Sequence, residues 1–226
     1  MPSLNSIDIA QAVIFVGMFL LISGPVHECA HAFVAWRLGD GTAKLFGRIS
    51  LNPVRHFDPI GGTLLAGSVF LSLIAGGAGI GFGWAKPTPV NPYNLRGRHA
   101  DSFVAAAGPL SNLVLAVLFA AGFQLLHRNG IVADNTTAIN MVQLVFQTGI
   151  TLNVMLMLFN LLPIPPLDGS HVLFDLLDPR TSQQLRGVMN QYGIMILVLF
   201  IFFGGHLIFS VVAPVVNFLA GTRIYY

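Results

Sequence analysis

The chain has 226 residues and a mass of 24.3 kDa; 54% of its residues are hydrophobic and 9% are charged. Soluble domains average about 25% charged residues, so this composition excludes a soluble globular protein and a disordered chain. The single cysteine, Cys29, excludes an intramolecular disulfide. A net charge of +2 gives no indication of nucleic-acid binding. We therefore expect a single integral-membrane domain over residues 1–226.

Four uncharged, apolar runs are long enough to cross a membrane as helices, and they cover residues 9–26, 103–126, 138–167 and 190–222. The first run lacks the basic segment and the small-residue cleavage site of a signal peptide, so we expect it to stay as a span. Pro214 is expected to end or kink the last helix. These runs predict an all-α polytopic membrane protein with four spanning helices.

A fifth uncharged run, residues 60–85, has a different composition. Its second half holds five glycines in the eight positions 76–83, which makes a poor isolated span. The spacing of Gly77 and Gly81 would allow close helix contact. A bend or a re-entrant turn explains the same glycines equally well, and both interpretations stay open.

The residues His27-Glu28-Cys29-Ala30-His31 form an HExxH motif at the end of the first run. On a helix continuing to Trp36, positions i and i+4 share a face, so both imidazoles can bind one zinc ion. The glutamate between them can then act as general base toward a water on the metal. The alternative is a pair of histidines that satisfy each other at a membrane boundary.

A third ligand must come from elsewhere in the chain. Glu28 is the only glutamate, which excludes a second Glu as ligand, and Arg37 stands where a metzincin needs histidine. Asp168 is favoured, because it follows a proline-rich break in an apolar run and precedes Gly169. His171 is the rival ligand, and a helix cap is the other role for Asp168. The full set of Asp and His candidates is His56, Asp58, His99, Asp101, His127, Asp134, Asp168, His171, Asp175, Asp178 and His206.

Together with the HExxH, three further segments resemble the site-2 protease family of intramembrane zinc metalloproteases: NLLPIPPLDG at 160–169, GPLSN at 108–112 and GWAKPTPVNP at 83–92. The chain is most similar to the short prokaryotic members without a PDZ or CBS domain. The resemblance implies one zinc ion per chain, bound by His27, His31 and Asp168. It also implies Glu28 as catalytic base and a place for Asn160 near the substrate carbonyl.

Two asparagines in the apolar runs have alternative roles. Asn160 either donates a hydrogen bond to the substrate carbonyl or its oxyanion, or makes an interhelical hydrogen bond. Asn112 either pairs with the substrate backbone or bonds to a neighbouring helix, and we favour the second role.

The order of the runs constrains the topology. His31 and Asp168 must lie at one membrane depth to share a metal, so one segment between them cannot make a net crossing. The glycine-rich run 60–85 is the natural choice, as a re-entrant insert. The segments 37–59 and 86–102 then lie on one side, and they carry seven of the eleven basic residues, which indicates the cytoplasm. Residues 48–52 alternate in polarity and predict a short β segment at that face, where an edge strand can bind an extended substrate.

The predicted function is hydrolysis of peptide bonds in transmembrane substrates near the cytoplasmic side of the cell membrane. The expected partners are single-span membrane proteins and the lipid bilayer, and no nucleic acid. A membrane metal transporter is one alternative, although the chain shows no internal repeat and a transporter has no need of Glu28 within the HExxH. A non-catalytic membrane scaffold is the other alternative.

Overall fold

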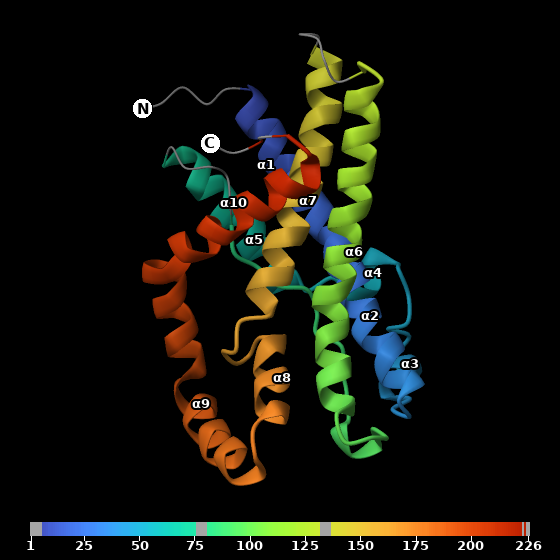
Figure 1. The fold of residues 1–226 in the computed structure, drawn as a ribbon, viewed down its shortest axis with the longest axis vertical. Coiled ribbons are helices and arrows are strands. Elements are labelled where there is room, and N and C mark those ends of the chain that lie inside the picture. Colours follow the sequence, from blue (N-terminus) through green and yellow to red (C-terminus); the bar gives the residue numbers. More distant parts are fainter. Residues whose placement is uncertain (1–5, 76–80, 132–136, 223, 225–226) are drawn as a thin grey trace.

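The computed structural model describes residues 6–75, 81–131, 137–222 and 224, with the backbone alone for 137–140. Within these ranges every regular element is a helix, and most of the long helices run roughly along one axis (Figure 1). The predicted β segment at residues 48–52 is wrong: no strand pairs there. The Ser50 carbonyl accepts a hydrogen bond from His56 Nε2 at 2.7 Å, and the Asn52 side chain caps the next helix through Val54 N. Local side-chain hydrogen bonds thus replace the backbone pairing that a β-strand would make in this segment.

The first span is one continuous helix with a π-helical turn in its middle. It consists of α1 (Ser6–Met18), the π-helix η1 (Phe19–Ser23) and α2 (Gly24–Arg37). Pro25 has no N–H to donate to the preceding turn, and the Gly24 N–H bonds back to Phe19 O over five residues instead of four. The helix ends one residue beyond the predicted Trp36, so the prediction of a single helix carrying the HExxH is confirmed.

The run 60–85 forms a helix followed by an extended segment that returns along it. After the short helices α3 (Thr42–Leu45) and α4 (Pro53–His56), α5 (Pro59–Ile74) is capped by Asp58. Residues 81–91, here called the return segment, contain no regular element. Phe82 N donates to Ser68 Oγ at 2.8 Å, and Lys86 N donates to His56 O at 2.8 Å. The described path therefore comes back to the level at which α5 began; Gly77 lies outside the described residues.

Buried side chains bond to the return segment at its middle and at its C-terminal end. Arg48 is buried and donates to Lys86 O at 3.3 Å. Asp40 is fully buried and accepts hydrogen bonds from Asn91 N at 2.7 Å and Asn94 Nδ2 at 3.0 Å, the latter in the 3₁₀ turn η2 (Pro92–Asn94). Burial raises the pKa of Asp40, but its hydrogen bonds outweigh burial and hold the pKa below its usual value.

The centre of the bundle is formed by α6 (Ala100–Arg128) and α7 (Thr137–Asn160), which confirm the second and third predicted spans. They pack against α2 on one side and α10 on the other. The core between α6, α7 and α10 is built from small and branched side chains: Ala116, Ala120, Phe123, Ile150, Val154, Val212, Val216 and Ala220. After α7, a proline-containing loop leads to α8 (Asp168–Leu176).

The C-terminal span joins α9 (Pro179–Leu199), the π-helix η3 (Phe200–Gly204) and α10 (Gly205–Ala220). It begins eleven residues before the predicted run, because Asp178 caps a polar first half through Arg180 N and Thr181 N. Pro214, predicted to end or kink the helix, lies inside α10; it does not end the helix, since α10 continues to Ala220. The change of direction in Figure 1 lies between α9 and α10, at η3.

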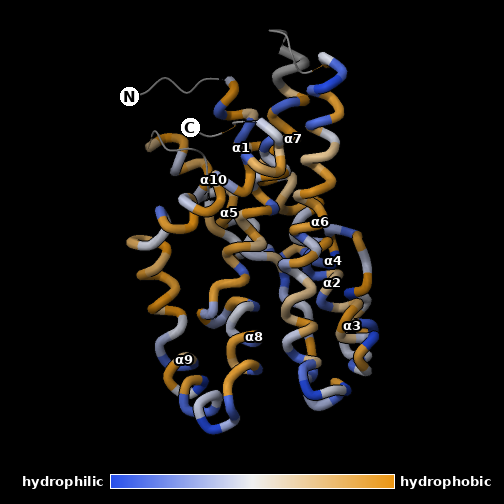
Figure 2. The backbone as a smooth tube through the Cα atoms, in the orientation of Figure 1, coloured by the Kyte–Doolittle hydropathy of each residue, from blue (hydrophilic) through white to orange (hydrophobic). Residues whose placement is uncertain are grey.

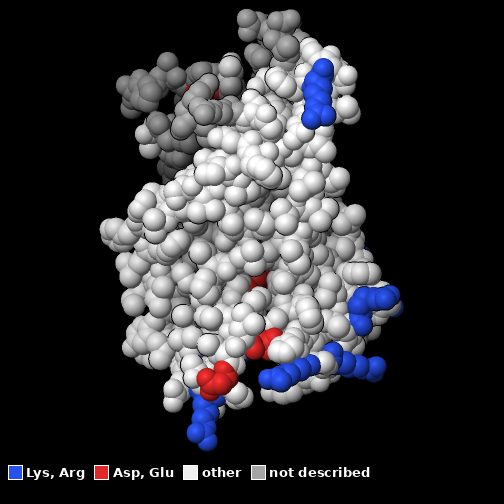
Figure 3. Space-filling model, viewed as in Figure 1, with Lys and Arg blue, Asp and Glu red and all other residues white. Residues whose placement is uncertain are grey.

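Within the described part of the chain, four helices are long and apolar enough to cross a membrane: Ser6–Arg37, Ala100–Arg128, Met141–Asn160 and Pro179–Ala220. Figure 2 shows their hydrophobic stretches along the middle of the molecule. Figure 3 shows most of the visible Lys and Arg around the lower ends of α6 and α9 and beside α3, below a face that is almost free of charge, with a further basic side chain at the upper end. The described helices thus have the charge distribution of a membrane protein with one basic end.

Candidate metal centre

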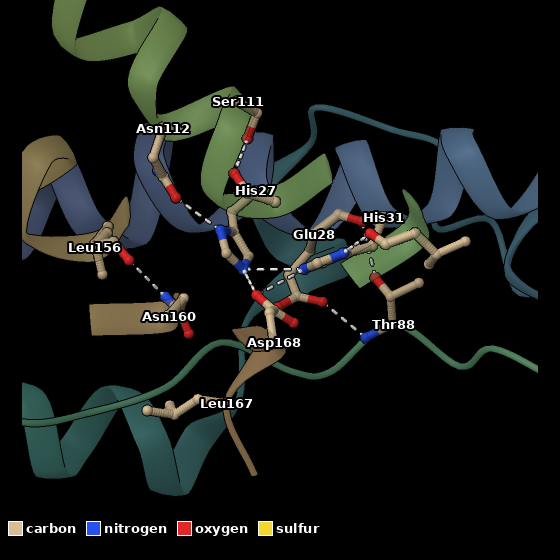
Figure 4. Close-up of polar contacts among 12 residues, drawn as sticks. His27, Glu28, His31, Thr88, Ser111, Asn112, Leu156, Asn160, Leu167 and Asp168 are labelled. Atoms are coloured by element: carbon tan, nitrogen blue, oxygen red, sulfur yellow. Dashed lines mark hydrogen bonds and ion pairs between the residues drawn. The ribbon is translucent and has the colours of Figure 1, made fainter. Parts of the chain in front are cut away.

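Three side chains from two separate helices converge in the lower half of the bundle. His27 and His31 lie one turn apart on α2, with their Nε2 atoms 3.0 Å apart. Asp168, the first residue of α8, places Oδ2 3.3 Å from His27 Nε2 and 3.4 Å from His31 Nε2 (Figure 4). The structure therefore brings together the three residues that the sequence placed at a metal.

The hydrogen-bond partners of the two imidazoles favour a cation between them. His27 Nδ1 donates to Asn112 Oδ1 and His31 Nδ1 donates to Val104 O, each at 2.7 Å. Neutral rings protonated at Nδ1 present lone pairs at Nε2, and these face each other. The buried Oδ2 of Asp168 also has no hydrogen-bond partner. Such electron-rich atoms repel one another unless a cation lies among them.

The spacing of these atoms fits zinc. Tetrahedral zinc with ligand bonds of about 2.0–2.1 Å holds its ligand atoms roughly 3.3 Å apart. The two carboxylate–imidazole separations of 3.3 and 3.4 Å match that edge, and the imidazole pair at 3.0 Å is slightly closer. Three protein ligands also leave one tetrahedral position open, as in catalytic zinc sites. The donor set and its spacing therefore fit a catalytic zinc ion.

A chain of amide hydrogen bonds fixes the orientation of His27. Asn153 Nδ2 donates to Gly149 O at 2.8 Å, which leaves Asn153 Oδ1 to accept from Asn112 Nδ2 at 3.0 Å. Asn112 Oδ1 is thereby turned toward His27. The favoured role for Asn112, bonding to neighbouring helices, is confirmed. Sequence reasoning missed Asn153, although an amide in the apolar run of α7 was the available signal.

Gly108 allows α6 to pass close to the imidazoles. A Cβ atom built on Gly108 would lie 2.6 Å from His27 Nε2, and it would also collide with His31 Nε2. Any side chain at this position would have to displace the rings. The close packing of α6 against the two imidazoles thus explains why the first residue of the GPLSN segment is glycine.

Glu28 lies beside the metal group and is bonded to the return segment (Figure 4). Its Oε2 accepts a hydrogen bond from Thr88 N at 2.7 Å, and its main-chain carbonyl accepts one from Thr88 Oγ1 at 2.9 Å. Thr88 is flanked by Pro87 and Pro89, which have no N–H, so it supplies the only backbone donor of that tripeptide. Sequence reasoning gave Thr88 no role, although the Pro-Thr-Pro pattern lay within a quoted segment.

His171, the rival candidate for the third ligand, lies apart from the metal group. His171 Nδ1 pairs with Asp101 Oδ2 at 2.9 Å, and this hydrogen bond raises the pKa of His171 above its usual value. Among the described residues, the group of three or more metal-binding side chains consists of His27, His31 and Asp168. The other described candidates do not join it, and Asp134 lies outside the described residues.

Asn160 lies at the end of α7 and donates to Leu156 O of its own helix at 2.9 Å. It also lines a cavity of about 580 Å³ that includes all three metal-group residues and Glu28. The wall opposite α2 comes from α7 and α8, and the return segment contributes Trp84, Pro87 and Thr88. The cavity thus brings the Glu28 carboxylate and the metal group together in one space.

Comparisons with known proteins agree with this geometry. The sequence profile of Peptidase family M50 matches residues 14–204. The chain is 40% identical over 185 residues to "Putative zinc metalloprotease YwhC" of Bacillus subtilis (strain 168), covering 80% of this chain and 78% of that protein. It is 36% identical over 202 residues to "Putative zinc metalloprotease Rip2" of Mycolicibacterium smegmatis, covering 84% and 70%.

A second "Putative zinc metalloprotease Rip2", from Mycobacterium tuberculosis (strain H37Rv), is 30% identical over 200 residues, covering 86% of this chain and 71% of that protein. No solved structure gives a significant match. The profile match, the relatives, the His/His/Asp group and the apolar helices lead to one conclusion. The chain belongs to Peptidase family M50, the site-2 protease family, and is an intramembrane metalloprotease whose cofactor is zinc.

Proposed function

We propose that this protease cleaves single-span membrane proteins in the cell membrane, close to the cytoplasmic face. One zinc ion would be held by His27, His31 and Asp168, with Glu28 as the general base. The observation that carries the proposal is the convergence of these four side chains on one cavity within a bundle of apolar helices. No nucleic acid is expected among its partners.

The chain's own residues divide the catalytic work. Zinc, when bound, polarises the scissile carbonyl and makes a water molecule acidic. Glu28 takes the proton of the attacking water and later gives it to the leaving nitrogen. Thr88 N holds one oxygen of that carboxylate at 2.7 Å, which leaves the other oxygen to face the water. Asn160, on the cavity wall, would donate its amide to the substrate carbonyl after leaving Leu156 O.

We further propose that α5 and the return segment re-enter the membrane from the cytoplasmic side. The bond between Lys86 N and His56 O, which brings the path back to its starting level, supports this topology. The basic residues at the same end of the bundle support the cytoplasmic orientation. Topology tags before Ile60, at Tyr93 and near Asn129 test it. Opposite sides for the first two tags would overturn the re-entrant arrangement.

Glu28→Gln tests the division of roles in the site. It is expected to lower cleavage by about 100-fold or more while zinc stays bound, because the base is lost and the ligands are untouched. The assay co-expresses the wild type or the variant with a panel of single-span proteins and compares uncleaved substrate. Cys29→Ala, one residue along the same helix, is the matched control and should cleave normally. Loss of zinc from Glu28→Gln would contradict the assignment.

A further inference from the structure

The proposed zinc ligands are held by two different helices. The rings of His27 and His31 are fixed against α6 through their Nδ1 atoms. Asp168 belongs to α8, a helix of nine residues that follows the loop 161–167. The place of Asp168 relative to the imidazoles therefore depends on how α8 docks on α6.

One face of α8 carries three polar side chains. Asp168, His171 and Asp175 occupy positions i, i+3 and i+7, so they lie along the same side of the helix. The first points at the histidines of α2, and the other two contact residues at the start of α6. The ligand and the docking contacts thus share one helical face.

The hydrogen bonds between α8 and the start of α6 form two groups, which we call the α6–α8 clasp. His171 Nδ1 donates to Asp101 Oδ2 at 2.9 Å, so α8 supplies the imidazole and α6 the carboxylate. In the second group the roles are reversed. Asp175 Oδ2 accepts from Ser102 Oγ at 2.6 Å and from His99 Nδ1 at 2.7 Å. The clasp consists of His99, Asp101, Ser102, His171 and Asp175.

The clasp lies outside the metal group and at its entrance. Asp101 and His171 line the same cavity as the metal group, whereas the side chains of His99 and His171 are about half exposed. None of the five belongs to the metal-binding group of the described residues. Their contacts therefore act on the site through the position of the α8 backbone.

We propose that the α6–α8 clasp positions Asp168 and thereby sets the affinity of the site for zinc. The inference rests on the ligand set of the proposed function. The physical reason for this effect is preorganisation. Without the clasp, binding zinc would cost the free energy of fixing α8 in place. The five residues are positioning residues, because none of them belongs to the metal-binding group and they act on Asp168 through the placement of α8.

The test is Asp175→Ala in the full chain, because this change removes two of the four clasp hydrogen bonds. The remaining ones are His171 to Asp101 and a long bond from Ser102 Oγ to His171 O at 3.5 Å. Zinc affinity is measured in detergent by competition with a chelating dye, and it should fall about 10-fold. The visible spectrum of Co²⁺ bound in place of zinc should lose tetrahedral intensity. Asp175→Asn keeps an acceptor oxygen for Ser102 and should restore most of the affinity.

Asp178→Ala is the matched control. Asp178 lies three residues further along and also accepts two hydrogen bonds, but these cap α9 instead of tying α8 to α6. Its loss should leave zinc affinity within about twofold of wild type. Wild-type affinity in Asp175→Ala, or an equal loss in Asp178→Ala, would overturn the inference.

Two further variants keep the result interpretable. If circular dichroism shows that Asp175→Ala has lost helix, Ser102→Ala decides instead, with unchanged zinc affinity and Co²⁺ spectrum as the overturning result. Asp168→Ala separates this inference from the proposed function. Zinc retained in Asp168→Ala would overturn the ligand set, whereas zinc lost there but kept in the folded Asp175→Ala variant would overturn the clasp alone.

Discussion

The two halves of the metal site are built in opposite surroundings. On the histidine half, α2 is bonded to α6 through buried groups, and Asn112 and Asn153 are both fully buried. On the aspartate half, α8 is bonded to α6 through imidazoles whose side chains are 46% and 48% exposed. A buried hydrogen bond has no water to replace it, while an exposed one competes with solvent. The histidine half should therefore be the rigid frame, and the aspartate half the adjustable part.

Removing a ligand from the adjustable half should have the largest effect. Asp168→Ala is expected to lower zinc occupancy strongly, because two neutral imidazoles alone bind the ion poorly and the negative charge is lost. His171→Ala should lower it much less, since His171 pairs with Asp101 and not with the metal group. Metal analysis of both purified variants gives the comparison. If His171→Ala loses more zinc than Asp168→Ala, the third ligand is misassigned.

Gly108→Ala tests the rigid half by adding a methyl group where α6 packs against the imidazoles. The added methyl group would lie 2.6 Å from His27 Nε2, so the rings or α6 must shift and both zinc content and cleavage should fall. Gly17→Ala is the matched control, because no atom lies within 4 Å of a Cβ built at this glycine of α1. Zinc content and thermal stability are measured for both. Normal zinc binding in Gly108→Ala would show that the histidine half is less rigid than its packing indicates.

Asn112→Leu and Asn153→Leu probe the hydrogen-bond chain behind His27. Each should weaken zinc binding by about 10-fold, the lower end of the range for residues that orient metal ligands. The double variant should be little worse than Asn112→Leu, because both residues belong to one chain of bonds. Ser111→Ala is the control, since its hydroxyl bonds only to Gly108 O of the same helix. Additive losses in the double variant would mean that Asn153 acts separately from His27.

Sequence reasoning succeeded where a pattern is local. Helical spacing alone places His27 and His31 on one face, and the four apolar runs became the four long helices. The position of Asp168 beside them came from a resemblance and from its place after a proline-rich break. The structure brings these three together, and their catalytic roles are tested by the variants above.

The errors and omissions come from contacts between distant segments. The polar alternation at residues 48–52 predicted a strand, but its groups bond to side chains such as His56 instead of a partner strand. Thr88 contacts Glu28 across 60 positions, and Asn153 contacts Asn112 across 41. No periodicity in one sequence reports pairings of this kind.

Gly81 lies outside both halves and should give the smallest effect on zinc. A Cβ at Gly81 would lie 2.5 Å from Ser68 Oγ and 2.8 Å from Val69 N, so the return segment would have to move away from α5. Gly81→Leu should therefore impair cleavage more than Gly81→Ala, with zinc bound in both variants. Zinc content and cleavage of a co-expressed substrate are read together. Unchanged cleavage in both variants would remove the return segment from the mechanism.

The division of the chain at α9 has a consequence for biogenesis. The hydrogen bonds described for the site and its clasp join residues between His27 and Asp175, whereas the final helix pair begins at Pro179 and adds Leu197 to the cavity wall. In the most apolar window of that pair, 6% of the residues are buried against the rest of the protein. Because a chain leaves the ribosome from its N-terminus, the zinc site can be completed before the last span is synthesised. We expect the nascent protein to acquire its metal while the C-terminal helices are still entering the lipid.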